Sequence, residues 1–198
     1  MTIQVRRLSL ECINQGDSVE SAIVRRWIPF LLIVIAVLLF DQLTKQWVLE
    51  NIALGETYLI IPDLHPYFQF TYSANTGAAF GIFPEAGALF QFLPLVIVVA
   101  MLYFVYRSGA DDHLMRVGFA LAVGGALGNV IDRLQHGHVI DFFHVYIPQI
   151  NLSNVSNFAD HAIVIGVIIL LIDNLWQERK KSKENAQATT GETSASGI

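Results

Sequence analysis

Charged side chains are scarce in this sequence. Only 15% of its 198 residues are Asp, Glu, Lys or Arg, and 54% are hydrophobic, whereas a soluble domain has about 25% charged residues. The 12 basic residues are outnumbered by 17 acidic ones, so the net charge of −5 provides no basic surface for nucleic acid. A single cysteine, Cys12, excludes an intramolecular disulfide and a cysteine metal cluster. These shortages indicate an integral membrane protein.

Two common hydrolase patterns are also missing. The sequence contains no G-x-S-x-G, which argues against the nucleophile elbow of the α/β-hydrolases. Its histidines in the C-terminal half include His136, His138, His144 and His161. Their spacing does not match H-E-x-x-H, and no third zinc ligand is evident. We therefore expect neither a metal nor a cofactor.

Four apolar segments predict transmembrane helices. They are Trp27–Trp47, Ala86–Tyr106, Val117–Ile131 and approximately residues 159–176. A helix rises about 1.5 Å per residue, so about 20 residues cross the bilayer core of about 30 Å. The third segment is short and glycine-rich, and Gly124 with Gly128 would allow another helix to approach closely. We expect a mainly helical, polytopic membrane protein.

Basic residues predict the orientation of these helices. Arg25 and Arg26 precede the first span, and Arg179 and Lys180 follow the fourth, whereas residues 49–85 contain no Lys or Arg. The positive-inside rule then places both termini in the cytoplasm and the long loops outside. No small-residue cleavage site follows the first span, so we expect it to be retained.

Composition divides the chain into three predicted regions. Residues 1–24 form a cytoplasmic N-terminal extension, and residues 25–177 form a four-helix membrane domain. Residues 178–198 are small and polar, which predicts a disordered cytoplasmic tail.

Several polar residues cluster toward the predicted outer side, where burial near lipid is costly. Lys45 follows Asp41 by four residues and can pair with it on one helix face. Asn75 lies among small residues, which also suits a simple turn. Asn129 and Arg133 share a helix face, and Arg133 is expected to contact an anionic or carbonyl-bearing partner. A structural ion pair and a turn asparagine remain alternatives to functional roles.

Three aspartates complete this outer set. Asp132 lies near the end of the third span and could simply terminate the helix. Asp141 follows an extended run, and Asp160 begins the fourth span, three residues after Asn157, where it could act as a helix cap. If Asp141 and Asp160 meet, two carboxylates at low dielectric share one proton. Such a pair can activate water and protonate a leaving amine, as in aspartic proteases.

Five sequence blocks resemble those of the lipoprotein signal peptidase (signal peptidase II) family. In order they are FDQLTK with Asp41 and Lys45, NTGAAF with Asn75, GNVIDR with Asn129, Asp132 and Arg133, GHVIDF with Asp141, and NFAD with Asn157 and Asp160. The blocks extend from residue 41 to residue 160. Their order and spacing make the resemblance specific.

The resemblance implies a four-helix membrane aspartic peptidase with a small extracytoplasmic β-structure. It implies Asp141 and Asp160 as the catalytic pair, with substrate contacts from Asn75, Asn129, Arg133 and Asn157 and supporting roles for Asp41, Lys45 and Asp132. The reaction would remove the signal peptide of a prolipoprotein before its diacylglyceryl-modified cysteine, in the bacterial inner membrane. Globomycin-type cyclic peptides would inhibit it, and we expect a monomer that contacts membrane lipid.

The chain departs from the family pattern at three positions. His161 follows the second aspartate, where a small residue is usual; Ser156 replaces an aromatic residue and Gly81 a serine. Two other functional classes stay open. A proton-coupled carrier would have acidic groups near the midplane and paired halves, and a scaffold would use its aspartates only as caps. The clustering of the acidic residues at the outer edge favours the peptidase.

Overall fold

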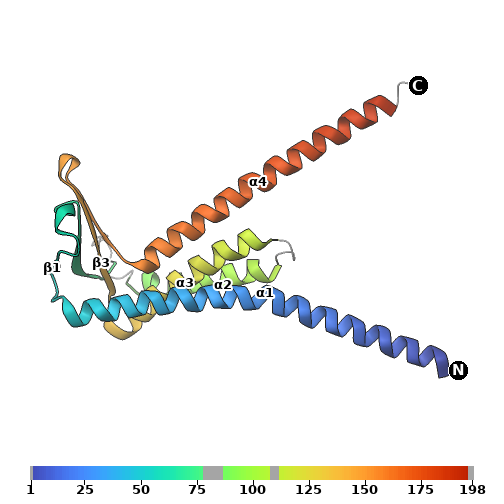
Figure 1. Cartoon of the computed structure of the whole chain (residues 1–198), viewed down its shortest axis with the longest axis horizontal. Helices are drawn as coiled ribbons and strands as arrows, with labels where there is room; N and C mark the ends of the chain where they lie inside the picture. The colour runs from blue at the N-terminus through green and yellow to red at the C-terminus, as the bar shows by residue number, and fades with distance from the viewer. Residues whose placement is uncertain (1, 78–86, 108–111, 196–198) are drawn as a thin grey trace.

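A computed structural model describes residues 2–77, 87–107 and 112–195, with side chains for residues 24, 27–77, 93–107 and 112–182. Within these residues the main elements are four α-helices and a four-stranded sheet (Figure 1). The helices are α1 (Thr2–Asn51), α2 (Gly87–Arg107), α3 (His113–His136) and α4 (Phe158–Ala195). The strands are β1 (Thr57–Tyr58), β2 (Phe68–Asn75), β3 (Val139–Ile147) and β4 (Leu152–Ser156). The sheet lies at one end of the helices, and both termini lie at the other (Figure 1).

The helices match the four predicted spans. Among the described residues, Trp27–Asn51, His113–His136 and Phe158–Ser182 are long and apolar enough to cross a membrane. Helix α2 begins and ends one residue after the predicted span Ala86–Tyr106, and the part of it described with side chains, Leu93–Arg107, is a shorter apolar helix. Many apolar side chains cover the outer surface of the helices, and some, such as Leu32 of α1 and Val99 of α2, are more than 60% exposed, which indicates a surface that faces lipid. The mainly helical membrane fold with a small sheet is therefore confirmed.

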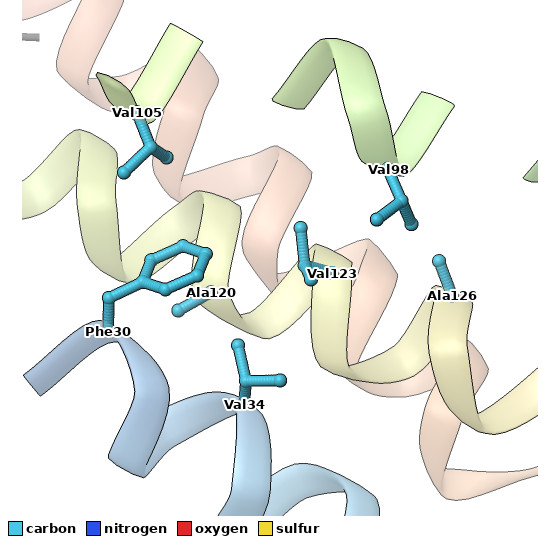
Figure 2. Packing of buried hydrophobic residues seen from close by; sticks show 7 residues of the cluster. All are labelled: Phe30, Val34, Val98, Val105, Ala120, Val123 and Ala126. Carbon is cyan, nitrogen blue, oxygen red and sulfur yellow. The ribbon is translucent and has the colours of Figure 1, made fainter. Parts of the chain in front are cut away.

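Helix α3 lies at the centre of the bundle, and most of its small residues are buried. The apolar core between α1, α2 and α3 is shown in Figure 2 and consists of Phe30, Val34, Val98, Val105, Ala120, Val123 and Ala126. Alanine and valine on α3 meet larger side chains on α1 and α2. This alternation of small and large side chains fills the space between closely spaced helices.

Glycines let α3 pack closely against α4 and α1, because a side chain at these positions would collide with atoms of the facing helix. A Cβ atom at Gly166 of α4 would lie 2.5 Å from the Gly118 carbonyl oxygen, and one at Gly125 would lie 2.3 Å from the Ala159 carbonyl oxygen. A Cβ atom at Gly128 would lie 2.6 Å from Asp41 Oδ2. The close helix approach that the sequence predicted at Gly128 is therefore present, and it makes room for a carboxylate.

The sheet has the antiparallel order β1-β2-β3-β4. Its central strands bring Ser73 opposite Asp141 and Asn75 opposite Val139. The start of β3 packs on the end of α1 through a buried cluster of Val48, Ile52, Ile140 and Phe142. Val139 and Ile140 of the extended run predicted before Asp141 begin β3, which continues through Asp141, and the register places Asp141 opposite Ser73 near the end of β2.

The first and last residues that the structure describes are helical. Helix α1 begins at Thr2, and α4 continues to Ala195, where the sequence analysis expected a disordered tail. Lys, Glu, Gln and Ala are frequent in residues 180–188, and all four are strong helix formers, which accounts for the continuation. The division into an extension, a membrane domain and a tail stays a prediction.

The contact between α3 and α4 leads to a stability prediction. Gly166→Ala should lower the free energy of unfolding by about 1–3 kcal/mol, because the added methyl group must push the two backbones apart. Thermal unfolding in detergent measures the change. Val167→Ala, at the next position on the lipid-exposed side, is the control and should cost less. Equal unfolding midpoints for the two variants would contradict the close packing.

Candidate active site

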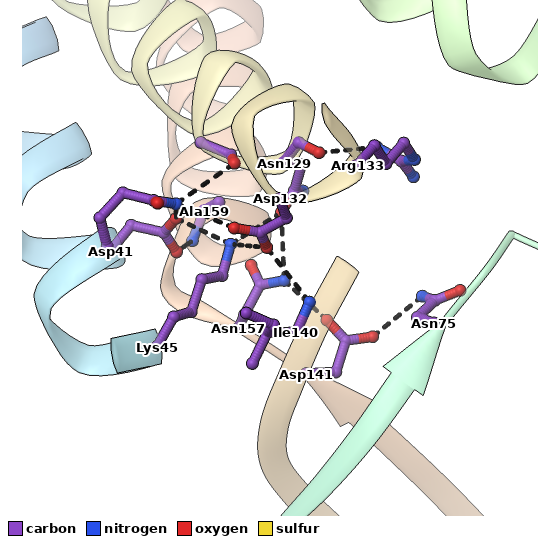
Figure 3. Close-up of polar contacts among 12 residues, drawn as sticks. Asp41, Lys45, Asn75, Asn129, Asp132, Arg133, Ile140, Asp141, Asn157 and Ala159 are labelled. Atoms are coloured by element: carbon purple, nitrogen blue, oxygen red, sulfur yellow. Dashed lines mark hydrogen bonds and ion pairs between the residues drawn. The ribbon is translucent and has the colours of Figure 1, made fainter. Parts of the chain in front are cut away.

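A buried ion cluster joins α1 to α3. Lys45 Nζ lies 2.7 Å from Asp41 Oδ2 and 2.7 Å from Asp132 Oδ2, and all three side chains are at most 1% exposed. The third partner of this ammonium is Asn129 Oδ1, at 3.1 Å (Figure 3). An ammonium has three N–H donors, so Lys45 is fully satisfied here. The pairing of Asp41 with Lys45 expected from their spacing is present, and Asp132 is an additional partner.

The two carboxylates of the cluster also hold backbone groups of other elements. Asp41 Oδ1 accepts a hydrogen bond of 2.9 Å from the Ala159 N–H in α4. Asp132 Oδ2 accepts one of 3.1 Å from the Ile140 N–H in β3. Gln42 Nε2 donates to Asp132 Oδ1 at 2.9 Å. The cluster therefore ties together α1, α3, α4 and β3.

Side-chain amides connect this cluster to Asp141 (Figure 3) and to Asp160. Asn157 Nδ2 donates to Asp141 Oδ1 at 2.6 Å and to Asn129 Oδ1 at 3.2 Å. Asn129 Nδ2 donates to Asp160 Oδ1 at 2.8 Å. Asn75 Nδ2 donates to Asp141 Oδ2 at 2.9 Å. The structure thus brings the two aspartates to one network of three asparagines.

Two of these asparagines are held in place by local backbone groups. Asn157 precedes α4 and accepts the Asp160 N–H at 2.9 Å through its Oδ1, which is the N-cap arrangement. Asn75 accepts the Gly77 N–H at 2.9 Å, in a turn where Gly77 has a φ of 74° that favours glycine. In each case the amide oxygen is occupied, so the N–H₂ group faces Asp141.

Arg133 and His161 lie at the edge of this network. Arg133 Nη1 donates to the Asn129 carbonyl oxygen of its own helix at 3.3 Å, and the anionic or carbonyl-bearing partner expected for it stays a prediction. His161 is exposed and stacks edge-on against Phe143, with 5.2 Å between ring centroids.

Both ring nitrogens of His144, in β3, have side-chain hydrogen-bond partners. His144 Nδ1 lies 3.0 Å from Gln69 Nε2 and 3.0 Å from Thr71 Oγ1, and its Nε2 lies 2.9 Å from Ser153 Oγ. Within the described residues, no group of three or more His, Cys, Asp or Glu side chains is arranged to hold a metal ion.

Electrostatics distinguish Asp141 from an ordinary aspartate. Burial raises the pKa of the Asp141 carboxyl to about 6, and the negative charge of Asp160 adds to this rise. Hydrogen bonds from Asn75 and Asn157 and the positive charge of Lys45 act in the opposite direction on the same pKa. Asp141 therefore loses its proton near neutral pH, in the range where a carboxyl group can exchange protons with a substrate or water.

Comparisons with known proteins decide the family. A family model described as signal peptidase (SPase) II matches residues 33–176, which include the whole network. The chain belongs to the signal peptidase II family. The lipoprotein signal peptidase of Histophilus somni is 40% identical over 163 residues, which cover 80% of this chain and 96% of that protein. The one from Shewanella sediminis is 36% identical over 159 residues, which cover 78% of this chain and 88% of that protein.

A solved structure agrees with this assignment. A bacterial membrane enzyme determined by the in meso method aligns with a TM-score of 0.67 at 33% identity, covering 74% of this chain and 92% of that one. As a signal peptidase II family member with membrane-spanning helices, the chain is a membrane protease of lipoprotein processing.

Some contacts in the site of this signal peptidase II family member were not predicted from the sequence. Asp132 was expected as a possible helix terminator, but α3 continues to His136 and ends at Gly137, which has a φ of 77°. Asp132 instead faces Lys45. Gln42 was missed, although its position next to Asp41 in a polar run of α1 was a usable signal. No sequence pattern indicated that the backbone N–H groups of Ile140 and Ala159 would bind the two carboxylates.

Asn75 provides a test of the electrostatics. Asn75→Ala should raise the pKa of Asp141 above about 6, because it removes a donor that favours the ionised carboxylate. Infrared titration of the protonated carboxyl band, assigned by its loss in Asp141→Asn, measures this pKa. Thr57→Ala removes an exposed hydrogen bond within the same sheet and should leave it unchanged. A fall in the Asp141 pKa in Asn75→Ala would contradict the hydrogen-bond assignment.

Proposed function

We propose that this signal peptidase II family member is an intramembrane aspartic endopeptidase whose catalytic residues are Asp141 and Asp160. Its reaction would remove the signal peptide of a prolipoprotein by cutting before the diacylglyceryl-modified cysteine. The observation that carries the proposal is the convergence of the two carboxylates on one network of amides, where Asn157 contacts the side chain of Asp141 and the backbone of Asp160.

The chemistry needs one proton shared between the two carboxylates. The ionised member removes a proton from a water molecule, whose oxygen adds to the scissile carbonyl carbon. The protonated member donates to the carbonyl oxygen and stabilises the tetrahedral intermediate. The C–N bond then breaks, the cysteine nitrogen takes a proton from the pair, and the signal peptide leaves with a new carboxylate. The proton belongs to the pair, so neither aspartate is assigned as sole base.

Substrate binding is assigned to Asn75, Asn129, Asn157 and Arg133. The amides already hold the aspartates, and Asn75 and Arg133 lie at the edge of the network, where a peptide backbone could approach. A guanidinium is suited to bind carbonyl oxygens of an extended chain because it presents several donors in one plane. Globomycin-type cyclic peptides would compete for the same groups.

The proposed topology places the site at the outer face of the bacterial inner membrane, with both termini in the cytoplasm. Basic residues favour this orientation, because the loop from residue 49 to residue 85 has none. The network lies at the sheet end of the bundle, opposite the termini (Figure 1). A substrate with an acylated cysteine would keep its acyl chains in the outer leaflet while its backbone reaches Asp160 at the start of α4.

The two aspartates are tested by isosteric substitution. Asp141→Asn and Asp160→Asn should each abolish cleavage of a purified lipidated precursor, because an amide cannot accept the proton of water or share one with its partner. Cleavage is followed by gel electrophoresis and mass spectrometry of the new N-terminus. Asp63→Asn, at an exposed position between β1 and β2, is the matched control and should cleave normally.

Other outcomes of this assay separate the alternatives. Normal cleavage by either variant would remove that aspartate from the mechanism. Equal cleavage of unlipidated precursor would contradict the proposed substrate class, and cleavage that persists with saturating globomycin would contradict the inhibitor assignment. A carrier or a scaffold would release no signal peptide from either precursor.

The proposed role of Arg133 in substrate binding is tested by measuring KM and kcat separately. Arg133→Ala should raise KM about 10-fold with little change in kcat, because the lost contacts serve the bound substrate and the transition state equally. Steady-state kinetics with a lipidated precursor measure both constants. Arg179→Ala removes the same charge from the far, exposed part of α4 and should match the parent. An unchanged KM for Arg133→Ala would show that Arg133 does not bind substrate.

A further inference from the structure

Asp141 and Asp160 have one structural feature in common: each follows a residue whose backbone N–H is held by a buried carboxylate. Ile140 precedes Asp141, and its N–H donates to Asp132 Oδ2 at 3.1 Å. Ala159 precedes Asp160, and its N–H donates to Asp41 Oδ1 at 2.9 Å. The start of β3 and the first turn of α4 are thereby attached to two different carboxylates.

A single ammonium joins these two carboxylates. Lys45 Nζ lies 2.7 Å from Asp41 Oδ2 and 2.7 Å from Asp132 Oδ2. Asp141 and Asp160 are therefore linked by two backbone hydrogen bonds and two short ion pairs. The two ion pairs share one atom, Lys45 Nζ. Because the whole path is buried, water cannot replace any of its links.

The third N–H of Lys45 determines the orientation of the Asn129 side-chain amide. It bonds to Asn129 Oδ1 at 3.1 Å, and Asn129 Nδ2 then donates to Asp160 Oδ1 at 2.8 Å. A rotated amide would point its N–H₂ group at the ammonium and its oxygen at the Asp160 carboxylate, and both contacts would be repulsive. The position of Lys45 thus also determines which atom Asp160 meets.

We propose that Lys45 is a positioning residue for the reaction: its ammonium sets the distance between Asp141 and Asp160 through one carboxylate to each, and orients the Asn129 amide toward Asp160. The inference rests on the proposed function of the two aspartates. Lys45 contacts neither of them directly, so it is not a catalytic residue. A purely structural lysine would instead affect the amount of folded protein and leave the turnover of each folded molecule unchanged.

Two variants separate these roles. Lys45→Met keeps the length and volume of the side chain but removes the bridge, and it leaves two buried carboxylates without a cation. Because this variant could fail to fold, Lys45→Met/Asp132→Asn removes one of those charges and restores the net charge of the cluster. An asparagine at position 132 retains an oxygen for the Ile140 N–H. Asp132→Asn alone and Gln46→Met, an exposed neighbour on α1, are the controls.

Kinetics per folded molecule are the first readout. Lys45→Met and the double variant should each lower kcat about 100-fold, the cost of a misplacement of about 1 Å, with KM close to that of the parent. The double variant should restore the folded yield without restoring kcat. Asp132→Asn alone should lose far less activity, and Gln46→Met none. Parental kcat in the folded fraction of either Lys45→Met variant would overturn the proposal.

A second readout does not require cleavage. The charged groups acting on the Asp141 carboxyl are Asp160 of α4 and Lys45 of α1. Asp160→Asn should lower the pKa of Asp141, measured by infrared titration, and this effect should shrink in the double variant background if the two aspartates have moved apart. An undiminished effect would overturn the positioning role. If the parent cleaves no precursor while the effect shrinks, the proposed function fails and the positioning role stands.

Discussion

The burial of Lys45 between two carboxylates is the constraint on which the rest of the structure depends. Charges removed from water must be paired and hydrogen-bonded, or the cost is several kcal/mol per ion. Lys45, Asp41 and Asp132 meet this requirement only when α1 and α3 are in register and when backbone N–H groups from β3 and α4 complete the carboxylates. Folding the ion cluster therefore brings four separate elements to one place.

The glycines of α3 follow from the same constraint. The Asp41 carboxylate fits between α1 and α3 because Gly128 has no side chain; a Cβ there would lie 2.6 Å from Asp41 Oδ2. Gly125 likewise admits the first turn of α4, which supplies the Ala159 N–H. In a membrane, where apolar side chains gain little by leaving lipid for protein, close packing and buried polar contacts are the main forces between helices. At this end of α3, Gly128 allows the close packing and the adjacent Asn129 makes the buried polar contacts.

Local patterns in the sequence were enough for the apolar part of each helix, for the start of the strand that contains Asp141 and for the pair of Asp41 with Lys45, because each depends on residues a few positions apart. The blocks that carry the family resemblance also identified every side chain of the network except Gln42. The second partner of Lys45 was not predictable, since Asp132 lies 87 positions away and its contact depends on the rotation of α3 against α1. Backbone donors such as the Ala159 N–H are present in every residue and become distinctive only through tertiary structure.

The separation of charge within the network explains how one site can hold both a stable ion cluster and a reactive carboxyl group. Asp41 and Asp132 contact the ammonium directly, whereas the hydrogen-bond donors to Asp141 are the neutral amides of Asn75 and Asn157. Lys45 therefore lowers the pKa of Asp141 only weakly, and burial keeps it at about 6. A direct lysine contact would stabilise the ionised form and remove the capacity to share a proton. The two amides fix the position of Asp141 without adding a positive charge, so its carboxyl group can still gain or lose a proton.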